Sequence, residues 1–373
     1  MLADGDIDAA ATTLRWAAFG VACAFGAISQ RTQFCTMGAL SDAVHVGDWR
    51  RLRMWVLAIA VAILGFNALV AFGVLAAGES VYANPRLLWL SHLVGGAMFG
   101  VGMVLASGCG AKTLVRVGGG NLKSLVVLLV LGATAFATLK GVTAVLRVDT
   151  VDAVGVTLPS TQELPALLAW ATGWSATAVA GWLGGVLGLG LIAWVCARRE
   201  GREVDVLLGG IGIGACVVAV WWLSGGPGFV PEHPATLEAV FLATNSRHME
   251  SLSFVAPVGY ALDWLVLYSD ANKVLTIGIV ACAGVVVGSW AMAILGKSFR
   301  WEGFGGVEDL ANHLGGAALM GVGGVTALGC TIGQGISGVS TLSVGSFITL
   351  AAIGAGAFAA LNYQAWRVER MAG

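Results

Sequence analysis

The chain has 373 residues, of which 57% are hydrophobic and 11% are charged, and its formal net charge is −1. Soluble domains carry about 25% charged residues, so the composition excludes a soluble globular protein, and the lack of a basic block excludes a nucleic-acid-binding surface. The seven cysteines form no C-x-x-C pair, so we expect no metal or redox cofactor. The composition predicts an all-α polytopic membrane protein.

Apolar stretches of about 20 residues recur along the chain, and each is long enough to cross a hydrocarbon core of about 30 Å. The predicted spans are residues 14–34, 53–77, 88–107, 122–146, 166–197, 204–224, 273–296, 308–328 and 343–367. The acidic start, MLADGDIDAA, lacks the basic region and short apolar core of a cleaved signal peptide. We therefore expect about nine transmembrane helices and a retained N-terminal segment.

Basic residues predict the orientation of these spans. If the N-terminus is outside, the cytoplasmic segments hold Arg31, Arg50, Arg51, Arg53, Lys112, Arg116, Lys123, Arg198, Arg199, Arg202, Lys297, Arg300, Arg367 and Arg370. The outer segments hold only Arg15, Arg86, Lys140, Arg147, Arg247 and Lys273. Because Lys and Arg are enriched in cytoplasmic loops, this bias predicts an N-out, C-in topology. Residues 225–272 then lie outside, where Tyr260 and Trp264 suit an interfacial or re-entrant helix; a tenth span there would weaken the charge bias.

The chain contains an internal repeat. HLVGGAMFGVGMVLASGC, residues 92–109, aligns without gaps to HLGGAALMGVGGVTALGC, residues 313–330, with 11 of 18 positions identical and an offset of 221. Packing through small residues alone is the competing explanation, but it does not account for the aligned histidines and cysteines. Equivalent points lie five crossings apart, which predicts two inverted repeats of the kind found in transporters. We expect a first repeat at 1–146, an outer loop and linking span at 147–200, and a second repeat at 201–373.

Each repeat ends a span in a glycine-rich cysteine loop. Irregular backbone at membrane depth is tolerated only where it is buried in protein or lines a cavity. Gly108 and Gly329 permit a sharp turn and leave backbone N–H groups uncovered. Such groups at a helix start can bind an anion, and Gly118–Gly120 before the fourth predicted span and Gly335 and Gly338 before the ninth are candidates for this role. A neutral thiol at Cys109 or Cys330 can also hydrogen-bond an anion. The loops predict a translocation path for an anion.

Other polar residues beside these loops are candidates for the same path. The Gln334 amide can donate to an oxyanion. Lys112 and Arg116 either draw an anion inward or anchor their loop against lipid head groups. His92 and His313 recur at equivalent ends of two spans, as parts of the path or as polar caps at the membrane interface.

Three motifs resemble a known family. QRTQFCTMGALSD (30–42), SGCGAKTLVRVGGGN (107–121) and GCTIGQGISG (329–338) are similar to the three cysteine-centred signatures of the YeeE/YedE family of bacterial inner-membrane proteins. The resemblance implies thiosulfate uptake, with the anion handed between Cys35, Cys109 and Cys330 by transient S–H hydrogen bonds. It also implies a multi-pass protein of the inner membrane and a small TusA-like sulfur carrier protein as a cytoplasmic partner.

Other functions remain open at this point. One alternative is a membrane sulfurtransferase in which a cysteine carries a persulfide, which needs an activated thiolate. Another is transport of a different sulfur or selenium species, and a third is a pore of the formate or ammonium kind. The four cysteines within plain apolar runs are interpreted as packing residues: Cys23, Cys196, Cys216 and Cys282.

Overall fold

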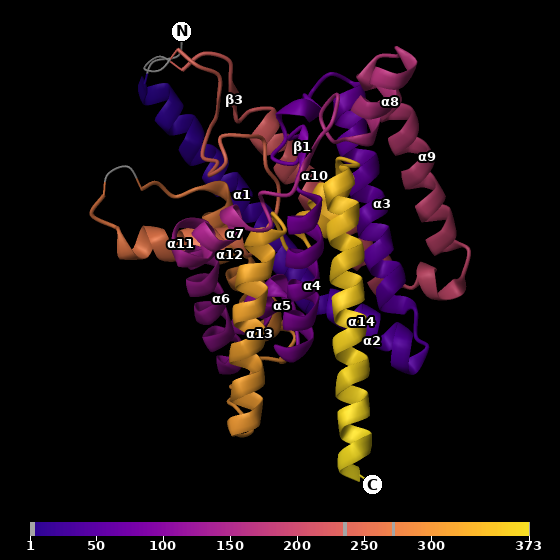
Figure 1. Ribbon diagram of the computed structural model, residues 1–373, viewed down its shortest axis with the longest axis vertical. Coiled ribbons are helices and arrows are strands. Elements are labelled where there is room, and N and C mark those ends of the chain that lie inside the picture. The colour runs from indigo at the N-terminus through magenta and orange to yellow at the C-terminus, as the bar shows by residue number, and fades with distance from the viewer. Residues whose placement is uncertain (1–3, 234–236, 271–272, 373) are drawn as a thin grey trace.

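The computed structural model describes residues 4–233, 237–270 and 273–372 of the chain, and helices dominate it (Figure 1). The first half contains α1 (Asp4–Thr32), α2 (Thr36–Ser41), η1 (Asp42–Val46), α3 (Arg50–Ala71), η2 (Ala77–Glu79), α4 (Trp89–Leu105), α5 (Gly110–Gly118), α6 (Leu122–Lys140), α7 (Val142–Asp149) and α8 (Leu164–Thr172). The second half contains α9 (Ala176–Cys196), η3 (Arg199–Arg202), α10 (Val204–Gly225), α11 (Ala256–Val266), α12 (Ile277–Leu295), α13 (Val307–Thr326), η4 (Gly333–Gly338) and α14 (Val344–Ala372).

Strands are few and short. In the described residues, β1 (Arg86–Leu87) pairs antiparallel with β2 (Val156–Thr157), and β3 (Phe229–Val230) pairs antiparallel with β4 (Val240–Phe241). All four strands lie in connections between helices; β3 and β4 follow each other in the chain, whereas α4 to α7 separate β1 from β2. The predicted all-α fold is therefore confirmed.

Eight helical segments of the described chain are long and apolar enough to cross a membrane. They contain α1, α3, α4 with α5, α6, α9, α10, α12 and α14. The ninth predicted span, 308–328, coincides with the 20-residue helix α13, but this helix carries Glu308, Asp309 and His313 in its first two turns and is not among the eight. Figure 1 shows α1 beginning at the top of the molecule and α14 ending at the bottom.

Several predicted spans are shorter or divided in the structure. The span predicted at 53–77 ends with α3 at Ala71, and the one predicted at 122–146 is interrupted at Gly141, where α6 gives way to α7. The span predicted at 166–197 is two helices, because Gly173 ends α8 with a left-handed φ of 75° before α9 begins. A residue in this conformation stops a helix, and glycine adopts it without steric cost.

The long helices pack in related pairs. The offset of 221 equates α3, α4 and α6 with α12, α13 and α14, and the order of the spans equates α1 with α10. Under this exchange the contact of α1 with α12 becomes that of α10 with α3, and the contact of α4 with α14 becomes that of α13 with α6; all four are present. This pairing supports the predicted repeat, while the insertion of its halves from opposite sides of a membrane stays a prediction.

Helices α4 and α13 cross at the centre through equivalent glycines. A Cβ atom on Gly95 would lie 2.6 Å from the backbone nitrogen of Ala327, and one on Gly316 would lie 2.6 Å from that of Ala106. These four positions are related by the offset of 221. Glycine is needed at both because the two backbones approach too closely for a side chain. The crossing places the ends of α4 and α13, and the cysteine loops that follow them, inside the protein.

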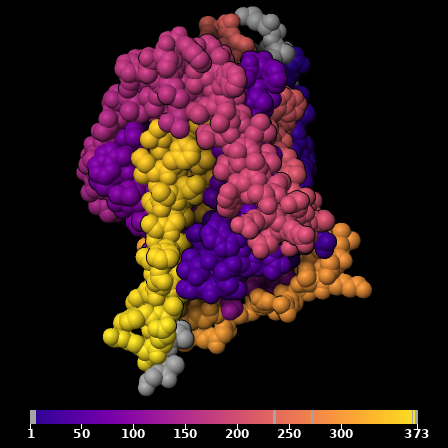
Figure 2. All heavy atoms as spheres, turned by 90° about the vertical axis from the view of Figure 1, so that its right-hand side faces the viewer, coloured from indigo at the N-terminus to yellow at the C-terminus, as the bar shows by residue number. Residues whose placement is uncertain are grey.

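The surface of the long helices is apolar. Figure 2 shows α9 and α14 on one face of the molecule. Large apolar side chains are exposed there, including Trp182 (72%), Leu189 (62%) and Phe358 (53%). A surface of this kind suits contact with lipid tails, so the apolar shell encloses an interior that holds the polar residues.

Candidate functional site

The three motif cysteines follow helix ends of the same geometry. Gln33 (φ 52°), Ser107 (φ 56°) and Leu328 (φ 59°) each lie two residues before a motif cysteine, in the left-handed region that is uncommon for residues other than glycine. They end α1, α4 and α13. In all three turns the residue just before the cysteine donates its N–H to a carbonyl five positions earlier: Phe34 to Ser29, Gly108 to Met103 and Gly329 to Gly324.

This arrangement is the Schellman motif, which turns the chain sharply at the end of a helix. A non-glycine residue held in this conformation costs about 1–3 kcal/mol, and such residues cluster at functional sites. Gly329 has a φ of 156°, and a Cβ atom there would lie 3.0 Å from Cγ of Gln334. The structure therefore supports the predicted role of Gly329 in the turn.

A new helical segment begins directly after Cys35 and after Cys109, and three residues after Cys330, at Gly333. The Cys35 Sγ accepts a hydrogen bond from the Gly38 N–H at 3.4 Å, and the Cys330 Sγ accepts one from the Gly333 N–H at 3.4 Å. Cys109 is the residue before α5, which has nine residues. Helix starts carry a partial positive charge from their uncovered N–H groups. The three thiols thus lie where backbone donors favour a negative ligand.

The thiols are buried and close together. The exposed fraction is 8% for Cys35, 2% for Cys109 and 0% for Cys330. Cys35 and Cys109 line a small cavity of about 10 Å³, here called the thiol cavity. Cys109 is within electrostatic range of Cys35 and of Cys330. A volume of this size holds about one water molecule, so the path between the thiols is closed in this structure.

Buried hydroxyl groups surround the thiols, and sequence reasoning missed them. Ser29 and Thr36 line the thiol cavity, and Thr331 lies beside Cys109. Their hydroxyl oxygens are buried without a hydrogen-bond partner in the described part of the structure. An unsatisfied buried hydroxyl is uncommon in proteins. The signal in the sequence was the Cys-Thr pair shared by the motifs FCTMG and GCTIG.

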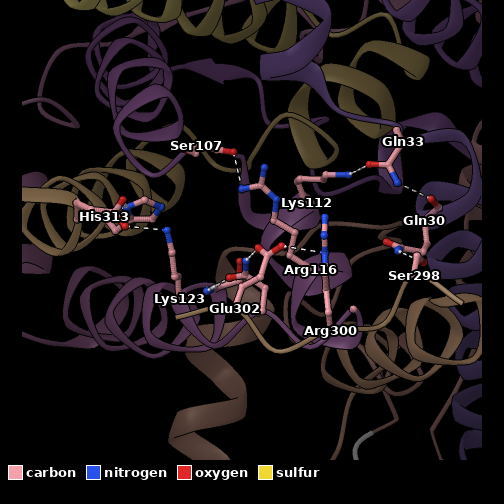
Figure 3. Close-up of a pocket in the computed structure, with 14 residues that line it drawn as sticks. Gln30, Gln33, Ser107, Lys112, Arg116, Lys123, Ser298, Arg300, Glu302 and His313 are labelled. Carbon is pink, nitrogen blue, oxygen red and sulfur yellow. Dashed lines mark hydrogen bonds and ion pairs between the residues drawn. The ribbon is translucent and has the colours of Figure 1, made fainter. Parts of the chain in front are cut away.

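A larger cavity of about 490 Å³ lies next to the thiol cavity and is here called the basic cavity (Figure 3). Its charged or titratable lining residues are Lys112, Arg116, Lys123, Arg300, Glu302, Asp309 and His313. Figure 3 shows Lys112 directed at Gln33 and Arg116 directed at Ser107. The Lys112 Nζ donates to Gln33 Oε1 at 2.9 Å, and an Arg116 guanidinium nitrogen donates to the Ser107 carbonyl at 2.7 Å. Both cations therefore support turns that precede a motif cysteine.

Lys112 connects the two cavities. It lines both the thiol cavity and the basic cavity, and its exposed fraction is 7%. No carboxylate of the described residues forms an ion pair with it, whereas Lys123 pairs with Asp309 at 2.7 Å. A buried charge without a counter-charge is unfavourable. Lys112 is therefore suited to an anion that arrives as its missing partner.

A third cavity of about 210 Å³ is here called the Glu250 cavity. It is lined by Glu250, Arg147, Tyr82, Ser253 and Leu328, among others. The Tyr82 hydroxyl donates to the Gly333 carbonyl at 2.6 Å, so this cavity adjoins the loop that follows Cys330. Val325, which lines this cavity, lies about 18 Å along the axis of α13 from His313 of the basic cavity, at 1.5 Å per residue. The two cavities lie at opposite ends of α13.

The remaining predicted residues have mixed placements. Gln334 is fully buried; its amide nitrogen donates to the Ala327 carbonyl at 2.7 Å and its amide oxygen accepts from Ser346 at 2.6 Å. These contacts hold the Cys330 turn in place, so they favour a positioning role over direct donation to an anion. His313 lines the basic cavity with its Nδ1 3.0 Å from Asp309.

His92 is placed differently from its equivalent. Its Nδ1 lies 2.7 Å from the Thr349 hydroxyl, and it lines none of the three cavities. Gly108 packs beside Lys112, where a Cβ atom would lie 3.3 Å from Cγ of that side chain. The four cysteines interpreted as packing residues, Cys23, Cys196, Cys216 and Cys282, also lie outside the three cavities.

Comparison with known proteins finds one family across most of the chain. Residues 31–359 match the family described as sulphur transport. The thiosulfate transporter TsuA of Escherichia coli (strain K12) is 28% identical over 326 residues, which cover 83% of each chain. TsuA of Spirochaeta thermophila is 26% identical over 370 residues, covering 89% of this chain and 94% of that protein. The probable transporter YedE of Escherichia coli (strain K12) is 30% identical over 100 residues, covering 26% and 22%.

Proposed function

The chain belongs to the sulphur transport family, which makes it a membrane transporter and not an enzyme, and we propose that it imports thiosulfate or a closely related sulfur oxyanion. The family resemblance seen in the three cysteine motifs is confirmed by this membership. The sulfurtransferase alternative is set aside with it. Thiosulfate is favoured because two relatives that align over most of the chain are thiosulfate transporters.

The observation that carries the proposal is Lys112, a buried ammonium group between the thiol cavity and the basic cavity with no carboxylate partner in the described structure. An anion in the thiol cavity supplies the missing countercharge. Two charges about 4 Å apart attract by about 4 kcal/mol at an effective dielectric constant near 20. This attraction draws the anion past Cys109 and then releases it among the other cations of the basic cavity.

The thiols and the hydroxyl groups would contact different ends of the substrate. Thiosulfate has a terminal sulfur and three oxygens. The thiols of Cys35, Cys109 and Cys330 hydrogen-bond the terminal sulfur in turn, without a stable covalent bond. The unpartnered hydroxyls of Thr36 and Thr331 donate to the oxygens. Each contact is weak, so the anion passes from one thiol to the next.

The closed path requires the cysteine turns to move during transport. Cys330 is fully buried and the thiol cavity holds about one water molecule. The turns before the cysteines store strain at Gln33, Ser107 and Leu328. Small backbone rotations at these three residues would open the path to one side of the membrane at a time, as expected for a transporter built from two repeats.

The proposal also covers the direction of transport, the membrane that holds the protein and the protein that receives the sulfur. Cationic residues cluster around the basic cavity, and cytoplasmic segments are rich in Lys and Arg. The Glu250 cavity is then the outer opening, and the basic cavity is the exit into the cytoplasm of a bacterium whose inner membrane holds the protein. A small TusA-like carrier, implied by the family resemblance, would receive the sulfur there.

Growth tests the substrate most simply. A host that lacks its own thiosulfate uptake is starved of sulfur and supplied with thiosulfate alone, with and without this chain. Growth that depends on the chain supports the proposal. Chain-dependent growth on sulfate or cysteine, but never on thiosulfate, would refute the choice of substrate.

A further inference from the structure

The Glu250 cavity contains an acidic group at the outer end of the proposed route. Glu250 lies between β4 and α11, and its side chain lines the cavity. Its carboxylate accepts hydrogen bonds from the Ser246 hydroxyl at 3.0 Å and from the Asn245 N–H at 3.4 Å, both within its own loop. No Lys or Arg of the described chain forms an ion pair with it. An acid is an unexpected lining for a cavity that must receive an anion.

The groups that face Glu250 from other elements do not neutralise it. They are Tyr82, Tyr260 of α11 and Arg147 of α7, which all line the same cavity. Arg147 is paired with Asp152 at 3.0 Å, so its charge is already balanced. The cavity therefore carries one net negative charge when Glu250 is ionised and none when Glu250 is protonated. Burial raises the pKa of Glu250 to about 7, so both states are populated near neutral pH.

We propose that Glu250 is a proton-binding residue of the transport cycle, and that a proton taken up there from the outer water admits the anion to the Glu250 cavity. This inference rests on the proposed function, because it assumes that an anion passes through this cavity. An ionised Glu250 repels a second negative charge in a partly dehydrated site. Protonation removes the repulsion and converts the carboxyl group into a hydrogen-bond donor.

The proposal predicts the pH profile of uptake. A single acid that titrates near neutral pH is about ten times more protonated at about pH 6 than at about pH 8. Thiosulfate keeps its full charge over this range, so the profile reports groups on the protein. We expect uptake by the wild-type protein to fall about tenfold between these pH values.

The experiment uses the full chain in lipid vesicles buffered at the same pH inside and outside, with radiolabelled thiosulfate as the probe. Glu250→Gln replaces the acid by a neutral group of the same shape, and its uptake is expected to stay near the wild-type acid-side value at both pH values. His248→Gln and Glu238→Gln alter two exposed titratable residues of the same outer segment. Uptake by both control variants is expected to fall about tenfold between these pH values, as in the wild-type protein.

The outcomes separate this inference from the proposed function. Wild-type uptake that is equal at both pH values, or a Glu250→Gln protein that keeps the slope, overturns the proton site and leaves thiosulfate transport standing. No uptake at either pH overturns both. An infrared titration of the purified wild-type protein needs no variant: a protonated carboxyl band must disappear as the pH rises through about 7. If no carboxyl group titrates there, the inference is wrong.

Discussion

The basic cavity and the Glu250 cavity lie at opposite ends of α13 and of the proposed route, but they differ in size and charge. The basic cavity is about 490 Å³ and contains four cationic side chains, of which Lys123 and Arg300 are paired with Asp309 and Glu302. The Glu250 cavity is about 210 Å³ and contains one arginine, whose charge is also paired. The basic cavity is therefore suited to attract an anion at any physiological pH, whereas under the proposal above the Glu250 cavity admits it only when Glu250 is protonated. The difference is consistent with the proposed inward direction, because Lys112 and Arg116, which form no ion pair in the described chain, both line the basic cavity.

The largest loss of transport is expected when the positive charge of Lys112, which lines both the thiol cavity and the basic cavity, is removed. Replacing Lys112 by Met should lower the uptake of labelled thiosulfate about 100-fold, because truncating one partner of a buried charge pair costs about 2–5 kcal/mol, and 1.4 kcal/mol is a factor of ten.

Lys123→Met is the matched control, since Lys123 lines the same cavity but is already paired with Asp309. We expect uptake by this variant to fall less than threefold, about the value of a partly exposed ion pair. Equal losses in the two variants would show that the basic cavity acts only through its total charge.

The hydroxyl beside the thiols should matter next. Thr331→Val keeps the shape but removes a hydrogen bond to a charged ligand, which is worth about 1.5–3 kcal/mol. We expect the KM for thiosulfate to rise at least tenfold, while Thr331→Ser stays within about twofold. Initial rates measured over a range of thiosulfate concentrations distinguish the two. If valine is tolerated, the unpartnered hydroxyl does not face the substrate.

Changing a thiol to a hydroxyl should have a moderate effect. Cys330→Ser retains a hydrogen-bonding group but exchanges a polarizable sulfur for oxygen, so partial uptake, reduced about tenfold, is expected; Cys330→Ala should be lower still. These values follow from a hydrogen bond to a charged group of about 1.5–3 kcal/mol. Complete loss in the serine protein, together with a thiosulfate-derived adduct on Cys330 detected by mass spectrometry, would instead indicate covalent sulfur transfer.

The smallest effects concern the repeat. Gly95→Ala and Gly316→Ala add a methyl group at equivalent points of the α4–α13 crossing. Each added Cβ atom would lie 2.6 Å from a backbone nitrogen at the end of the other helix. Overpacking typically costs about 1–3 kcal/mol, so both should lower the thermal stability of the detergent-purified protein by similar amounts. If one substitution leaves the thermal stability unchanged and the other lowers it strongly, the two halves of the chain do not pack in equivalent ways.

Much of the fold was predictable because its signals are local. Apolar runs predicted the positions of the long helices. The gapless match of residues 92–109 to residues 313–330 predicted a repeat, and the equivalent helices α4 and α13 contact each other in the structure. The errors arose where one glycine ends a helix inside an apolar run, as at Gly141 and Gly173. Hydropathy does not register such a turn, because glycine is also frequent within membrane helices.

The site was only partly predictable. The cysteine motifs predicted three linked loops, and the structure buries all three thiols near one another. The roles of Thr331 and Glu250 depend on which side chains face a cavity, and that information is long-range. Gln334 shows the same dependence on the fold, since its amide already has partners in Ala327 and Ser346. Only the folded chain shows which polar groups already have partners.

A structure of the protein with bound thiosulfate tests the central claim most directly. The account predicts that the anion lies between the motif cysteines, with its terminal sulfur within hydrogen-bonding distance of the Cys109 or Cys330 Sγ and an oxygen near the Thr331 hydroxyl or the Lys112 Nζ. An anion held by residues outside the three cavities, with the thiol cavity still closed, would contradict it.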